Sequence, residues 1–183
     1  MKPRHVHLGF IYIMNWEIMP PVSFMAAPRK RGKMTDWKAS CHPDILKVLD
    51  YWESKRRGRH MPSRDDIDPT EIVKFLPYVS IIDVVEDARR FVYRLVGTME
   101  VEVRGYDPTG KSVGDGYFAA NADAAMANYQ RVCDTQAPFY EKDAFQVVDR
   151  WINEANLFLP LSDDGEIVNK VLVFSINRDL YER

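Results

Sequence analysis

The chain has few of the residues from which small proteins build metal, haem or disulfide sites. It has 183 residues and two cysteines, Cys41 and Cys133, which lie far apart with no CxxC neighbour. Neither a disulfide framework nor a thiolate zinc site is therefore supported, and we expect a cytoplasmic protein in a reducing compartment. All four histidines lie within the first 60 residues. No apolar run reaches the roughly 18 residues that a membrane-spanning helix needs, so no membrane association is expected.

The chain also lacks the sequence motifs of the common enzyme classes. No P-loop and no GxGxxG motif occurs. Histidine–aspartate pairs at residues 42–44 and 60–66 could act as acid and base, but they stand at a helix start and in a turn, where capping and solvated roles are commoner. The acidic turn at residues 163–164 supplies too few oxygen ligands for a calcium loop. We therefore predict that the protein is not an enzyme and holds no metal.

The composition is that of a soluble domain with an uneven distribution of charge. With 46% hydrophobic and 28% charged residues, the chain can bury one core. Residues 1–64 carry 13 Lys and Arg against 5 Asp and Glu, whereas residues 65–183 carry 12 against 22. The basic stretches at residues 29–33 and 55–59 keep nucleic-acid binding open as an alternative, although charge runs are more often solvated surface.

Residues 1–33 differ from the rest of the chain. A seven-residue apolar stretch, residues 8–14, is interrupted by polar residues and followed by two prolines, which makes a poor signal-peptide core. We expect residues 1–33 to be disordered or an untranslated leader, and Met34 to be the natural start. The rival interpretation is a secretory or membrane-associating leader. Residues 34–77 are expected to form an N-terminal helical extension, and residues 78–183 the core of the domain.

A helix is predicted from about residue 42 to residue 58. A proline and an acid occupy its first turn, cations occupy its last turn, and Gly58 follows. It carries an apolar stripe at helical spacing, formed by Ile45, Leu46, Val48, Leu49 and Trp52. The stripe either packs on the domain or covers a partner. Because contiguous apolar patches usually mark interaction sites, we predict a homodimer with an interface formed by Ile45, Leu46, Leu49 and Trp52.

Residues 90–115, RFVYRLVGTMEVEVRGYDPTGKSVGD, are the most informative stretch. They begin as a strand with aromatic and aliphatic residues on alternating faces. The strand stops at Gly97, a short helical elbow follows, and Gly105 closes it. The strand, the elbow and GYDPTGKSVGD together resemble the centre of a PAS domain. They are most similar to the bacterial standalone single-domain PAS proteins (PAS type 5 subfamily), and MPSRDDIDP, residues 61–69, resembles the same group.

The remaining segments follow the order that this resemblance implies. Periodicity predicts strands at residues 78–85, 91–96, 137–144, 153–161 and 167–176, and a helix at residues 121–134. The fold class is therefore α+β. The resemblance implies a PAS fold, a five-stranded antiparallel sheet with short helices and one longer helix on one face, after an N-terminal helical extension.

The resemblance also implies a cavity between the second strand, the elbow and the long helix. Its lining would be Tyr93, Leu95, Thr98, Met99, Val103, Tyr106, Met126 and Tyr129. Arg94 would suit a carboxylate or phosphate if it pointed inward. Strand alternation places it opposite Tyr93, so an outward position is favoured.

Cofactor signatures of the family are missing from their expected places. Flavin-binding members carry a reactive cysteine before the long helix, whereas Cys133 lies near the far end of that helix; haem-binding members carry an axial histidine on or after it. We therefore expect neither flavin nor haem, and leave open an unknown small ligand. The resemblance implies a sensory or regulatory protein that binds a small ligand, a signalling partner such as a histidine kinase, or both. The alternatives are a small enzyme or carrier on an NTF2-like cone fold, and nucleic-acid binding.

Overall fold

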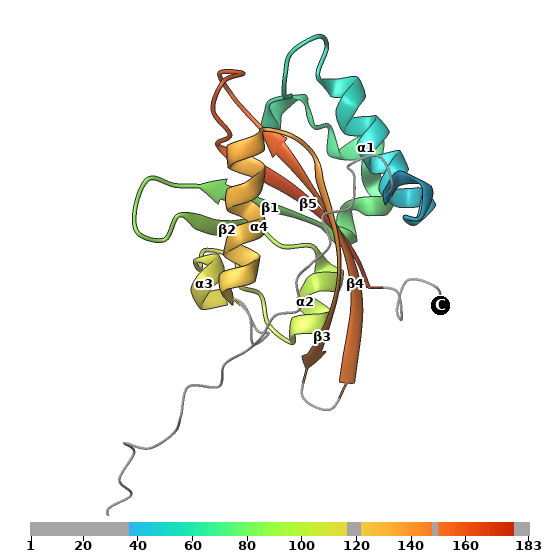
Figure 1. Ribbon diagram of the computed structural model, residues 1–183, viewed down its shortest axis with the longest axis vertical. Helices are drawn as coiled ribbons and strands as arrows, with labels where there is room; N and C mark the ends of the chain where they lie inside the picture. Colours follow the sequence, from blue (N-terminus) through green and yellow to red (C-terminus); the bar gives the residue numbers. More distant parts are fainter. Residues whose placement is uncertain (1–36, 117–121, 148–149, 178–183) are drawn as a thin grey trace, which may run out of the picture. The chain divides into compact units, whose positions relative to one another are not determined.

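The computed structural model describes residues 37–116, 122–147 and 150–177 (Figure 1). The predictions for residues 1–33 lie outside the described residues. Within the described part, none of the helices has both the length and the apolar character required to cross a membrane.

Five strands form one antiparallel sheet in the order β2-β1-β5-β4-β3. The strands are β1 (Val79–Val84), β2 (Phe91–Leu95), β3 (Phe139–Val147), β4 (Arg150–Leu161) and β5 (Lys170–Asn177). All five were predicted from the sequence, with boundaries that differ by a few residues. One of these shifts is at β5, which begins at residue 170 instead of 167. The cause is local, because Asp164 Oδ1 accepts hydrogen bonds from the backbone N–H groups of Glu166 and Ile167 and holds both residues in the turn.

The register of the strands separates two chemically different faces. On β4 and β5, Leu157 pairs with Phe174 and Leu159 pairs with Leu172, so these side chains share one apolar face. On the opposite face, Asn156 pairs with Ser175 and Phe158 pairs with Val173. This second face is part apolar and part polar, and it is the face on which the candidate site lies.

The N-terminal extension covers the apolar face. Its main helix is α1 (Pro43–Lys55), which begins as predicted with proline in the first turn and His42 Nδ1 accepting a hydrogen bond from Asp44 N. Trp52 is buried, and its indole N–H donates to the carbonyl oxygen of Pro160 at 2.9 Å. The short helix η1 (Trp37–Ala39) adds a stacked ring pair between Trp37 and Tyr140.

The predicted homodimer interface assumed that the apolar stripe of α1 is exposed on a single chain, and this assumption is wrong. Ile45, Leu49 and Trp52 are 0%, 2% and 2% exposed within their own chain, and Leu46 is half-buried. The same core cluster contains residues of β1, β4 and β5. The apolar stripe is therefore removed from water by this chain's own sheet and needs no second copy to cover it.

Two short 3-10 helices join α1 to the sheet. They are η2 (Arg64–Asp66) and η3 (Pro69–Tyr78), and η3 is kinked at Ile72. A helix start at residues 68–70 was predicted, and Asp68 does accept a hydrogen bond from Thr70 N at 2.8 Å. Phe75 packs edge-on against Phe174, with ring centroids 5.3 Å apart, so η3 covers the same face as α1.

Three helices cover the second face (Figure 1): α2 (Thr98–Arg104), α3 (Val113–Gly116) and α4 (Ala122–Thr135). Tyr129 of α4 lies with its ring centroid 5.3 Å from that of Phe158 and 5.4 Å from that of Phe91. Gly97 precedes α2 and lies against η3, because a Cβ at this position would be 2.4 Å from the carbonyl oxygen of Pro77. Only glycine fits at such a close approach of two backbones.

Candidate functional site

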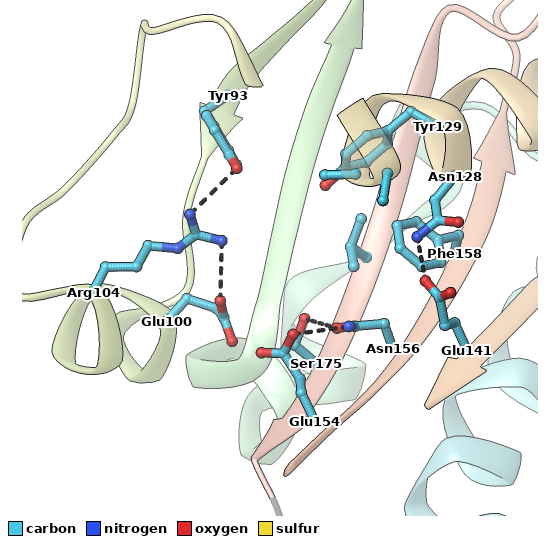
Figure 2. A pocket seen from close by; sticks show the side chains of 13 residues that line it. Tyr93, Glu100, Arg104, Asn128, Tyr129, Glu141, Glu154, Asn156, Phe158 and Ser175 are labelled. Carbon is cyan, nitrogen blue, oxygen red and sulfur yellow. Dashed lines mark hydrogen bonds and ion pairs between the residues drawn. The ribbon is translucent and has the colours of Figure 1, made fainter. Parts of the chain in front are cut away.

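A cavity lies between the second face of the sheet and helices α2 and α4 (Figure 2). Its volume is about 50 Å³. The helices contribute Glu100 and Arg104 from α2 and Ala124, Ala125, Asn128 and Tyr129 from α4; the sheet contributes Tyr93, Glu141, Glu154, Asn156, Phe158, Val173 and Ser175. The wall is therefore unusually polar for the inside of a small domain.

One end of the cavity is formed by an ion pair on α2. Glu100 and Arg104 are four residues apart, so they lie on the same side of the helix. Arg104 Nη2 donates to Glu100 Oε2 at 3.3 Å, and Arg104 Nη1 donates to the hydroxyl oxygen of Tyr93 at 3.3 Å. The two charged side chains are 9% and 6% exposed. A pair so shielded from water interacts more strongly than a surface pair.

The pKa values of Tyr93 and Arg104 determine which charges this end of the cavity carries. Burial raises the pKa of Tyr93, so the phenol stays neutral at physiological pH. Burial alone would lower the pKa of Arg104, but Tyr93 and Glu100, which are both anionic at the high pH where an arginine titrates, outweigh burial and raise that pKa. The guanidinium is therefore a permanent cation held by the cavity wall.

A second carboxyl group comes from the sheet. Asn156 Nδ2 donates to Glu154 Oε2 at 2.8 Å, and Ser175 Oγ donates to Asn156 Oδ1 at 2.6 Å (Figure 2). Burial of its carboxyl raises the pKa of Glu154 well above the ordinary value, and the charge of Glu100 raises it further. Glu154 and Glu100 also share a hydrogen bond. Two carboxyl groups this close do not both ionise easily, so Glu154 keeps its proton beside the Glu100–Arg104 pair.

A third carboxyl group stands at the other side of the cavity. Glu141 of β3 is 9% exposed and accepts a hydrogen bond from Asn128 Nδ2 of α4. Its backbone pairs with that of Asn156 in the sheet, so the carboxyl projects from the same face. The cavity therefore contains three carboxyl groups and one guanidinium.

Two of the predicted cavity residues line this cavity, Tyr93 and Tyr129. The other predicted residues lie elsewhere in the described part: Leu95 is 47% exposed, Thr98 is exposed, and Met99, Val103, Tyr106 and Met126 are half-buried outside the lining. Arg94 is exposed at the end of β2 and outside the lining, which is the outward position that was favoured over an anion contact inside the cavity.

The residues that were missed had weak signals in the sequence. The spacing of Glu100 and Arg104 within a short helix predicts a shared face, but it does not say that the face is buried. Glu154 and Asn156 alternate with apolar residues, which is the pattern of a strand with one solvated face. The structure places α2 and α4 over that face, so the polar residues become the wall of a cavity.

The basic stretch at residues 55–59 is largely neutralised. Lys55 forms an ion pair with Glu71, Arg56 with Glu53 at 2.8 Å, and both Arg57 and Arg59 with Asp66. Hydrogen bonds from Ser63 and then from Arg59 lower the pKa of Asp66 to about 2, so its carboxylate stays charged. A phosphate backbone would have to compete with these acids, which weakens the nucleic-acid alternative. The stretch at residues 29–33 lies outside the described residues.

One protein family matches most of the chain. The PAS domain family matches residues 40–173. Among solved structures, the PAS domain of Bordetella pertussis BvgS is 15% identical with a TM-score of 0.47, covering 61% of this chain and 87% of that one. A Rhodobacter sphaeroides LOV protein is 11% identical with a TM-score of 0.43, covering 63% of this chain and 70% of that one.

A third similar structure is the LOV domain of the Erythrobacter litoralis EL346 blue-light activated histidine kinase. It is 15% identical with a TM-score of 0.40, and the match covers 55% of this chain and 94% of that one. Among curated protein sequences, none matches the chain.

Proposed function

The chain belongs to the PAS domain family, and on that premise we propose that it is a cytoplasmic sensory protein that binds a small polar ligand and acts through a signalling partner such as a histidine kinase. Because the chain has the PAS fold, we do not propose the alternative of an enzyme or carrier on an NTF2-like cone fold. PAS domains are in general sensory rather than catalytic, so we propose no enzymatic activity. We also propose that the purified protein is colourless, because the cysteine and histidine positions typical of flavin and haem binding are not filled.

The polar cavity is the observation that carries this proposal. A domain that needed only a core would fill the space between α4 and the sheet with apolar side chains. Here that space holds a guanidinium and three carboxyl groups, and burying such groups is costly unless they are well paired. Perturbed titratable groups in a cavity are typical of binding sites. We therefore propose that the cavity is kept for a ligand.

The cavity volume limits the size of the ligand. About 50 Å³ corresponds to a few water molecules, since one buried water needs roughly 10–15 Å³ of such space. Pockets for drug-sized molecules are several-fold larger. The ligand that fits without rearrangement has only a few heavy atoms.

The test is a thermal-shift screen with small polar molecules, followed by titration calorimetry. Ala124 of α4 lines the cavity, so Ala124→Leu fills it without removing a charge. Ala127 lies on the same helix but is exposed, so Ala127→Leu is the matched control. We expect a ligand that stabilises the wild type and Ala127→Leu but not Ala124→Leu. If no molecule in the screen stabilises the wild type, or if a stabilising molecule still binds Ala124→Leu, the proposed site is wrong.

The signalling partner forms the second part of the proposal. Its test is co-purification of the intact protein with the histidine kinases of the same cell, with and without ligand. A homodimer stays part of the proposal, but through a surface other than the stripe of α1, which is buried in the protomer. Sedimentation equilibrium of the wild type measures it directly, and a monomer at all concentrations would remove the dimer from the proposal.

A further inference from the structure

We infer that one proton, held between Glu154 of β4 and Glu100 of α2, keeps α2 docked against the sheet, and that loss of this proton releases the helix. This inference goes beyond the proposed function, because it concerns the docking of α2 and its test needs no ligand.

The first step is the contact between the two carboxyl groups. The side chains of Glu100 and Glu154 point toward one another from α2 and from β4 (Figure 2), and they share a hydrogen bond. An ionised carboxylate can only accept hydrogen bonds, so a hydrogen bond between two carboxyl groups exists only while one of them keeps its proton. Glu100 already accepts a hydrogen bond from Arg104 Nη2 at 3.3 Å, which favours its ionised form. Glu154 is therefore the acid that donates.

The second step is the way in which α2 meets the sheet. Of its seven residues, Glu100 alone is buried, and its apolar residues are only half-buried. Its contacts with the strands come from polar side chains: Arg104 donates to the hydroxyl of Tyr93 on β2, and Glu100 accepts from Glu154 on β4. The docking of α2 therefore depends on polar contacts, and the contact with β4 requires a proton.

The third step is the set of charges that Glu154 meets. Among the described side chains, the titratable groups that border the cavity with Glu154 are Glu100 and Arg104 of α2, Tyr93 of β2, Tyr129 of α4 and Glu141 of β3. Arg104 favours ionisation of Glu154, but it is the one cation of this set, and Glu100 is already its partner. Burial and the charge of Glu100 have the larger effect and raise the pKa of Glu154 well above 4.5. Glu154 therefore keeps its proton while α2 is docked.

Ionisation of Glu154 and docking of α2 oppose each other. When the proton passes to water, Glu154 loses the O–H group that donates to Glu100, and two negative charges face each other in a shielded site, where repulsion is strong. The half-buried side chain of Glu154 borders the cavity, so water can reach it to take the proton. Movement of α2 away from the sheet separates the two charges. A rise in pH therefore shifts α2 toward its undocked form.

The test is hydrogen exchange of the full chain between pH 5 and pH 8, followed by mass spectrometry. Exchange is expressed as protection, the ratio of the intrinsic to the observed rate, which removes the pH dependence of the chemistry itself. We expect the protection of residues 98–104 to fall by up to about tenfold per pH unit, because undocking releases one proton, until the pH passes the docked-state pKa of Glu154. It should also stay below the protection of α4 and be insensitive to low concentrations of urea, as local opening requires.

Three variants assign the proton. Glu154→Gln keeps a donor for Glu100 but cannot ionise, so the protection of α2 should no longer change with pH. Glu100→Gln removes the opposing charge and should reduce the fall. Glu86→Gln removes an exposed carboxylate and should follow the wild type. Far-ultraviolet circular dichroism checks that each variant is folded.

Three outcomes would overturn the inference. If the protection of α2 in the wild type does not change between pH 5 and pH 8, no proton controls its docking, and this result needs no variant. If α2 and α4 have the same protection at every pH, the helix opens only when the whole domain unfolds. If folded Glu154→Gln loses protection with pH as the wild type does, the proton belongs to another group. None of these measurements involves a ligand, so their failure is distinct from failure of the proposed function.

Discussion

Replacing Glu154 with Gln is expected to stabilise the protein increasingly as the pH rises. The carboxyl of Glu154 faces Glu100 and Arg104 from α2, Tyr93 from β2 and Glu141 from β3. Burial and the charge of Glu100 raise its folded-state pKa well above the ordinary value of 4.5. Glutamine has nearly the shape of the protonated acid and can make the same donation to Glu100, but it cannot ionise.

The sign and size follow from proton linkage. Below pH 4.5 the folded and unfolded wild type both bind this proton, so the group contributes its full stability. Above that value the unfolded state releases the proton while the folded state keeps it. The free energy of unfolding then falls by at most about 1.4 kcal/mol per pH unit, until the pH passes the folded-state pKa. Glu154→Gln removes this one-proton slope.

Urea unfolding between pH 4.5 and pH 8, followed by tryptophan fluorescence, measures the effect. The difference in free energy of unfolding between Glu154→Gln and the wild type should grow with pH, at a slope of up to about 1.4 kcal/mol per unit. Glu86→Gln removes one exposed carboxylate and should run parallel to the wild type. If the Glu154→Gln curve also runs parallel to that of the wild type over the whole range, the reasoning is refuted, because the Glu154 carboxyl is then not protonated in the folded protein.

Three further predictions concern packing and the leader. In urea unfolding, Trp52→Ala should lower the free energy of unfolding by about 3–5 kcal/mol. Trp52→Phe should lower it by about 1–3 kcal/mol, because the Pro160 carbonyl loses its donor. A folded, fully stable Trp52→Glu monomer would contradict the burial of this side chain. Gly97→Ala places a methyl group 2.4 Å from the Pro77 oxygen and should cost about 1–3 kcal/mol by the same assay, and a neutral effect would show that α2 is free to shift. Deletion of residues 1–33 should change the melting temperature by less than about 2 °C in calorimetry, because no core-forming periodicity occurs there; a loss of several degrees would show that the segment packs on the domain.

The fold could be predicted because it depends on short-range patterns. The alternation in β4, the proline and acid at the start of α1, and Gly105 at the end of α2 each specify a local conformation. Their order was enough to identify the sheet. What covers the stripe of α1 could not be predicted, because the amphipathic pattern is the same whether the apolar face meets its own sheet or a second protein.

The candidate site was predicted much less well than the fold. Tyr93 and Tyr129 were expected from the resemblance to the family, and both line the cavity. Glu100, Glu141 and Glu154 were not, since a charged residue is assigned to the surface unless a partner is known. Glu100 and Glu154 have partners close in sequence, Arg104 and Asn156, but their burial depends on α2 and α4 closing over the sheet, which a single sequence does not show.

The shortness of α2 has a consequence for how a ligand reaches the cavity. An isolated helix of seven residues is unstable in water, because helices shorter than about 12–15 residues seldom persist without tertiary contacts. The local unfolding free energy of α2 is therefore set mainly by what it touches: the Pro77 backbone against Gly97 and the ion-paired groups of the cavity wall. Its amide protons should exchange with solvent sooner than those of α4 and β5. Because α2 carries Arg104, we expect this wall of the cavity to open at the lowest free-energy cost. A ligand would then enter and leave when this two-turn helix loosens, while the sheet stays intact.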